Sequence, residues 1–180
     1  MDIEEYKNHF YGEIKKQIVF AKFSLDDISR DTELILNCNS KLVNQDKFWY
    51  SVQGLLVSLA NISKILYPPD KYYRKRGDFL KRELNLNVSS IFKNRDIRNH
   101  FEHYDEHIDK FFKNLDQRGS IFVDSNMCEV TIQGIDMPIV YMRNYQPKTK
   151  IIKFKDMSLS LDTVEKDLEM LSKKLDNLLN

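Results

Sequence analysis

A continuous apolar periodicity over residues 45–67 is the feature that most restricts what this 180-residue chain can fold into. Apolar side chains recur there at three- and four-residue spacing, so that on an α-helix they share one face: Phe48, Val52, Leu55, Leu56, Leu59, Ile62 and Leu66. Pro68 and Pro69 then end the helix, because proline lacks an amide hydrogen and clashes with the preceding turn. Other positions are apolar too, which predicts the most buried helix of a helical core, with Trp49 and Tyr50 as packing residues.

Two more helices are predicted near the ends of the chain. The first runs from Asp2 to about Lys22, with acidic residues in its first turn, and the polar segment 24–31 predicts a break after it. A short helix is expected over residues 34–42. The last helix, over residues 161–180, carries apolar residues at regular three- and four-residue spacing: Leu161, Val164, Leu168, Leu171, Leu175 and Leu178. This apolar seam is too short for a free coiled coil. We therefore predict a bundle helix that packs on the core, with a dimer seam as the alternative.

Between these helices the sequence changes character. Four short runs rich in β-branched or aromatic residues are separated by turn signals, at residues 120–124, 128–133, 138–145 and 149–155. In the second run, apolar and polar residues alternate, as in a half-buried strand. We therefore predict a mainly α protein: a single domain with an antiparallel helical bundle (1–118), a three- or four-stranded antiparallel β-meander (119–159) and a C-terminal helix (160–180).

Composition narrows the class of protein. Apolar residues make up 42% and charged residues 31%, the only two cysteines lie far apart, and no run reaches the eighteen apolar residues that a membrane span needs. Together with a polar, acidic N-terminus, this predicts a soluble cytoplasmic protein with no membrane partner. The net charge of +1 argues against a protein dedicated to coating DNA, although a local basic patch is compatible with it.

The segment from Arg95 to Lys110 holds three of the four histidines, and one helix there separates two faces. Its apolar side chains fall within a sector of about 100° and predict docking on a core: Ile97, Phe101, Tyr104, Ile108, Phe111 and Phe112. The other side carries Arg98, Asn99, Glu102, His103, Glu106 and His107. A solvated helix carries mostly lysine and glutamate, so this face favours binding or chemistry.

The pattern Arg98-Asn99-x-x-x-His103 resembles the R-x(4–6)-H motif of HEPN domains, in which a polar residue follows the arginine. The resemblance covers six residues within a helical context of about twenty. It implies a bundle of four or five helices that is commonly a homodimer. It also implies a metal-independent ribonuclease without a cofactor, or the toxin of a toxin–antitoxin pair, in which arginine and histidine meet across the dimer. The partners implied are RNA and, for a toxin, an antitoxin protein. The predicted meander is not part of the minimal bundle.

Such a nuclease needs a base for the 2′-hydroxyl, an acid for the leaving oxygen and positive charge on the phosphate. Histidine suits the proton transfers because its unperturbed pKa is about 6.5, and arginine offers a fixed charge with a planar donor fork. We therefore assign Arg98, Asn99 and His103 as catalytic candidates, supported by Glu102, His100 and His107. The basic segment after the proline pair, together with Arg95, is the candidate RNA contact: Arg74, Lys75, Arg76, Lys81 and Arg82. Basic side chains that cover apolar surface are the simpler alternative for that segment.

Two other functions stay open. The same face fits a non-catalytic HEPN-like module that binds RNA, a nucleotide or a protein. The third hypothesis is a structural helical protein whose histidine face is incidental or holds a metal, because His100, His103 and His107 share a sector of about 60°. His9, the remaining histidine, offers no second ligand pair, so we assign no metal and no cofactor.

Overall fold

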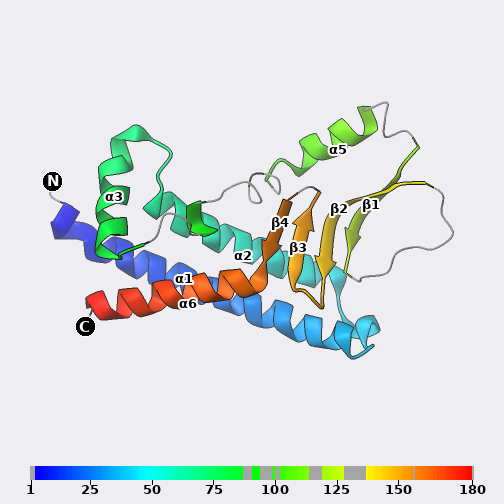
Figure 1. Ribbon diagram of the computed structural model, residues 1–180, viewed down its shortest axis with the longest axis horizontal. Helices are drawn as coiled ribbons and strands as arrows, with labels where there is room; N and C mark the ends of the chain where they lie inside the picture. The colour runs from blue at the N-terminus through cyan, green and yellow to red at the C-terminus, as the bar shows by residue number, and fades with distance from the viewer. Residues whose placement is uncertain are drawn as a thin grey trace.

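Three long helices form the body of the protein. The computed structural model describes residues 3–86, 91–93, 99, 102–113, 119–127, 137–155 and 157–179. Helices α1 (Ile3–Leu36), α2 (Gln45–Leu66) and α6 (Leu161–Leu179) pack together as the long layer in Figure 1. The predicted helices over 45–67 and 161–180 are thereby confirmed. Within the described residues, no helix is both long and apolar enough to cross a bilayer.

Helix α1 is one uninterrupted helix of 34 residues, so the predicted break at residues 24–31 is wrong. Leu25, Ile28 and Thr32 extend the buried stripe through that polar segment. The helix ends where Cys38 adopts a left-handed backbone (φ 61°) and the Asn39 amide returns to the Leu34 carbonyl at 2.8 Å, which satisfies an orphan carbonyl. The expected short helix over 34–42 is therefore also wrong, since only a 3₁₀ turn, η1 (Ser40–Leu42), follows.

A short basic helix closes one end of the body. After the proline pair, the 3₁₀ turn η2 (Lys71–Tyr73) leads into α3 (Arg74–Glu83), and η3 (Ile91–Lys93) comes next in the described chain. Leu80, Leu84 and Phe92 bury their side chains in the common core. Gly77 allows α3 to pass directly over the end of α2.

A four-stranded sheet precedes α6, as predicted, but its topology corrects the antiparallel meander. The strands are β1 (Ile121–Asn126), β2 (Ile139–Gln146), β3 (Ile151–Phe154) and β4 (Met157–Ser160), in that order across the sheet. The pairs β2–β3 and β3–β4 are antiparallel, whereas β1 pairs with β2 in parallel. Residues 127–138 separate β1 from β2, a length that suits a crossover between parallel strands. The predicted strand over residues 128–133 lies outside the described residues.

The sheet packs on α1 and α2 through a small set of large side chains. Tyr145 of β2 is fully buried and lies 4.9 Å from the Phe48 ring, and its hydroxyl is 2.6 Å from that of Thr32 on α1. Trp49 packs edge-on against Phe154 of β3, so it is the packing residue that we predicted. Tyr50, one position on, is 75% exposed, and its packing assignment is wrong because it points away from this interface.

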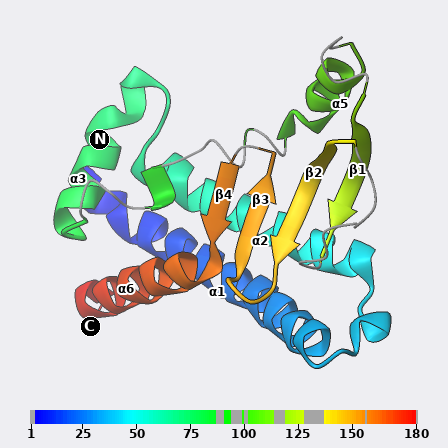
Figure 2. The ribbon, with the colours of Figure 1, turned by 45° about the vertical axis from the view of Figure 1, so that its right-hand side comes forward.

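Helix α5 (Tyr104–Lys113) lies apart from the three long helices, over β1 and β2 (Figure 2). Its buried Phe111 stacks with Phe122 of β1 at 5.1 Å. Phe112 also contacts Phe122 but is 67% exposed. The described part of the predicted apolar stripe thus docks on the sheet, and Ile97 and Phe101 lie outside the described residues.

Gly77→Ala is expected to destabilise the protein by about 1–3 kcal/mol, as overpacking does, even though alanine favours helix. A Cβ atom at this position would lie 2.6 Å from Pro68 Cδ and 2.7 Å from the Leu66 carbonyl oxygen. Urea unfolding monitored by circular dichroism measures the change. Gly12→Ala is the control: its Cβ meets nothing within 4 Å, so this exposed helical position should gain up to about 1 kcal/mol. An unchanged midpoint for Gly77→Ala would contradict the close crossing.

Candidate functional site

The described part of the motif forms an exposed helical turn at the start of α5. The His103 amide donates to the Asn99 carbonyl at 3.0 Å, and the His107 amide donates to the His103 carbonyl at 3.3 Å. Asn99, Glu102 and His103 are exposed, and His107 is half-buried. Asn99 and His103 therefore occupy successive turns of one exposed surface, accessible to a large ligand.

His103 is oriented by a carboxylate that the sequence analysis did not assign. Its Nδ1 atom lies 3.1 Å from Glu106 Oε1, and both side chains are more than half exposed. An ionised carboxylate only accepts hydrogen bonds, so in the neutral form of the ring this contact favours the tautomer with its proton on Nδ1 and the lone pair on Nε2. Nε2 is then the atom able to accept a proton. The three-residue spacing of His103 and Glu106 was a readable signal for this pair.

Arg95, Arg98 and His100 lie outside the described residues, so their positions relative to His103 stay predictions. Among the residues that the structure does describe, no group of three or more histidine, cysteine or acidic side chains is placed to hold a metal ion. The distance between Arg98 and His103 follows only from helix geometry, about 7.5 Å of rise and about 140° of rotation.

A polar cluster that the sequence analysis missed attaches α5 to the sheet. The Tyr104 hydroxyl donates to Asp124 of β1, and Arg143 of β2 forms an ion pair with the same carboxylate at 2.6 Å. The Arg143 guanidinium also lies 4.9 Å from the centre of the Tyr104 ring and 5.7 Å from that of Trp49. Burial, reinforced by the hydrogen bond to Asp124, raises the pKa of Tyr104 to about 12. The cluster sets the orientation from which α5 presents His103.

The predicted basic contact lies on α3, at the end of the molecule opposite α5 (Figures 1 and 2). Arg74 and Lys75 are exposed. Arg76 is half-buried: its guanidinium lies 4.8 Å from the Phe10 ring and 5.2 Å from the Tyr73 ring, and it donates to the Lys64 carbonyl at 3.2 Å. Arg76 therefore ties α3 to α1 and α2. For this residue the structure agrees with the simpler alternative, in which a basic side chain covers apolar surface.

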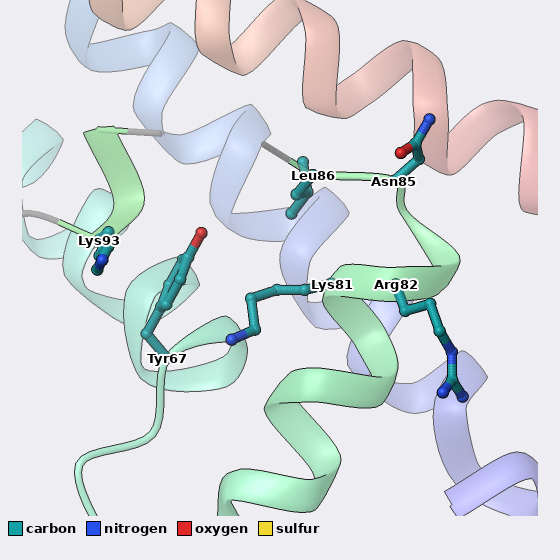
Figure 3. A pocket seen from close by; sticks show the side chains of 6 residues that line it. All are labelled: Tyr67, Lys81, Arg82, Asn85, Leu86 and Lys93. Carbon is teal, nitrogen blue, oxygen red and sulfur yellow. The ribbon is translucent and has the colours of Figure 1, made fainter. Parts of the chain in front are cut away.

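The remaining two basic residues, Lys81 and Arg82, line a pocket of about 390 Å³ next to α3 (Figure 3). Its other lining residues are Tyr67, Asn85, Leu86 and Lys93. Lys93, which comes from η3, was not among the predicted contacts. The sequence offered no signal for it, because it reaches the pocket through the fold and not through the basic run.

Arg143→Ala is expected to loosen α5 from the sheet, because it removes the ion pair to Asp124 and the contact with the Tyr104 ring. Amide hydrogen exchange should accelerate about tenfold or more within α5, while α1 and α2 keep their protection. Lys16→Ala, which removes an exposed ion pair to Glu13 within α1, is the control and should leave α5 unchanged. Equal exchange of α5 in both variants would contradict the role of the cluster.

Tyr104 should be the tyrosine whose ionisation couples α5 docking to alkaline pH. Its folded pKa of about 12 exceeds the ordinary tyrosine value of about 10, so the protonated phenol is favoured by folding. This contribution is fully present below about pH 10 and is lost as pH rises towards 12. Absorbance at 295 nm should show a step near pH 12 that loses the amplitude of one tyrosine in Tyr104→Phe and keeps it in Tyr72→Phe, where the side chain is 84% exposed. An undiminished step in Tyr104→Phe would overturn the assignment.

Comparison of the chain with protein-family models, with curated proteins and with solved structures finds no match. The HEPN resemblance therefore depends on the motif Arg98-Asn99-x-x-x-His103 and its helical context. The described structure contributes a mainly helical fold, a mixed sheet before the last helix and an exposed His103–Glu106 pair.

Proposed function

We propose that the chain is a HEPN-like, metal-independent endoribonuclease that uses the exposed face at the start of α5. In this proposal His103 moves the proton of the RNA 2′-hydroxyl, and Arg98 stabilises the negative charge that develops on the phosphate. Asn99, one helical turn before His103, positions the phosphate. Regulation as the toxin of a toxin–antitoxin pair is the biological setting that the resemblance implies.

The observation that carries the proposal is the His103–Glu106 pair. A base must keep an unprotonated nitrogen directed at the reactant, and the 3.1 Å contact with Glu106 favours the neutral tautomer that leaves Nε2 for that task. The pair lies on the surface, where a polynucleotide can reach it, and next to Asn99 in the helix. Both features are those that a ribonuclease of this kind needs.

Dimerisation supplies the second half of the proposed site. Within one helix, Arg98 and His103 are separated by about 140° of rotation, so one copy does not form a compact arginine–histidine pair. Two copies related by a two-fold axis would bring each arginine opposite the histidine of the other. The exposure of the polar side chains of α5 supports this, because it leaves this face accessible to a second copy: Asp105, Glu106, Asp109 and Lys110.

Cleavage of mixed RNA by the purified protein in excess EDTA tests the proposal. We expect products with 2′,3′-cyclic phosphate ends, and a loss of roughly 10²–10⁴-fold in rate for His103→Ala, the magnitude of general acid–base catalysis. Arg98→Ala should lose activity to a similar degree because it removes charge stabilisation. Glu106→Gln keeps the shape of its side chain and should lose less, since it removes only the charged partner of His103.

His9→Ala is the matched control, because this exposed histidine on α1 lies far along the sequence from the motif and is not assigned a role. It should cleave like the unmodified chain. If His103→Ala retains full activity, the catalytic assignment is wrong. Cleavage that requires a divalent cation would overturn the metal-independent mechanism.

A non-catalytic HEPN-like binding module is the second candidate function. It is favoured by the exposure of Asn99, Glu102 and His103, which leaves the same face accessible to RNA, a nucleotide or a protein. Absence of cleavage together with RNA binding that Arg98→Ala weakens would support this function over the nuclease. The two candidate functions therefore use the same surface around His103 and differ in whether bound RNA is cleaved.

A further inference from the structure

The pocket beside α3 is a cavity that the proposed nuclease does not use. It lies where the end of α2 (Tyr67), the end of α3 (Lys81 and Arg82) and η3 (Lys93) come together. Its volume of about 390 Å³ falls within the range of small-molecule sites. Figure 3 shows the Tyr67 ring between Lys93 and Lys81, with Leu86 above them and the Arg82 side chain extending away from the ring.

The lining is strongly cationic. Three of its six residues carry a positive charge, and none of the six is a carboxylate. The Lys81 ammonium lies 4.6 Å from the centre of the Tyr67 ring and 2.9 Å from Asp78, whose side chain is 72% exposed. Water screens the charge of the exposed Asp78 carboxylate, so a more highly charged anion in the pocket can compete with it for the half-buried Lys81.

The rest of the lining supplies a surface for a planar, weakly polar group. Tyr67 and Leu86 are half-buried, and Asn85 offers a side-chain amide at the rim. Burial, together with the nearby charge of Asp167, raises the pKa of Tyr67, so its phenol is protonated at neutral pH and adds no negative charge. Cations beside an aromatic and an aliphatic side chain match the two halves of a nucleotide, a phosphate and a base.

We propose that this pocket binds a nucleotide phosphate, with Lys81 and Lys93 as the ammonium groups that contact the phosphate. The ligand is either a free mononucleotide or the phosphorylated end of an RNA chain, since both present the same chemistry. Arg82, at the outer side, adds long-range attraction. The proposal does not depend on the nuclease, because it uses residues of α2, α3 and η3 and none of α5.

Two binding measurements test the proposal on the full chain. Isothermal titration calorimetry with AMP probes the free nucleotide, and fluorescence anisotropy compares a short 3′-labelled RNA carrying a 5′-phosphate with the same RNA carrying a 5′-hydroxyl. The Lys81→Gln/Lys93→Gln double variant should weaken binding about tenfold or more, the loss expected for charged contacts to phosphate. Lys41→Gln/Lys166→Gln is the matched control: it removes two exposed lysines elsewhere and should change the Kd less than about twofold.

The outcomes distinguish a free nucleotide from the phosphorylated end of an RNA chain and show when the proposal is wrong. Tight AMP binding identifies a free nucleotide as the ligand, and a preference for 5′-phosphate over 5′-hydroxyl RNA identifies a chain end. Lys93→Gln alone guards against misfolding, because this side chain is exposed and its replacement should still weaken binding while the melting temperature stays unchanged. The proposal is overturned if the unmodified chain binds neither AMP nor 5′-phosphorylated RNA at millimolar concentration. It is equally overturned if the pocket variant binds as tightly as the control variant.

Discussion

The close pairing of α1 with α2 is the contact on which the rest of the structure depends. Gly54 of α2 faces Ser24 of α1 so closely that a Cβ atom at Gly54 would lie 2.9 Å from the serine hydroxyl. The sheet packs on this helix pair through Phe48 and through the buried hydrogen bond between Thr32 and Tyr145. Because buried hydroxyl groups must be paired, that bond fixes where β2 lies along α1.

Helix α5 is held in a different way, and the difference bears on function. Among the described residues, its attachment consists of one aromatic cluster around Phe122 and one polar cluster around Asp124, both on the sheet. In this described part of the chain, the three long helices contribute to these clusters only the Trp49 ring beside Arg143. Side chains on the polar face of α5 can therefore be replaced without disturbing the packing of the core. This arrangement suits a functional site on a stable scaffold.

The local sequence predicted the helices whose apolar pattern repeats over many residues. It failed to predict features that depend on contacts between distant residues. The helices over 45–67 and 161–180 carry five or more turns of apolar periodicity, and both form. The polar segment 24–31 predicted a break, yet Asp31 and Thr32 are buried and the helix continues. The parallel pairing of β1 with β2 and the ion pair between Asp124 and Arg143 join distant residues, so no local pattern announces them. The His103–Glu106 pair, at helical spacing, was within reach of the sequence.

The packing of α6 against α1 has a consequence for how the chain folds during synthesis. Lys15 and Asp176 meet at 2.7 Å although 161 positions separate them, and the buried leucines of α6 complete the core that α1 begins. Until α6 leaves the ribosome, the α1–α2 hairpin has to persist with one apolar side uncovered. Such long-range closure is slow, and it leaves hydrophobic surface exposed in the meantime. The nascent chain is therefore expected to be most prone to aggregation, and most dependent on chaperones, after the sheet has been synthesised and before α6 can pack on α1.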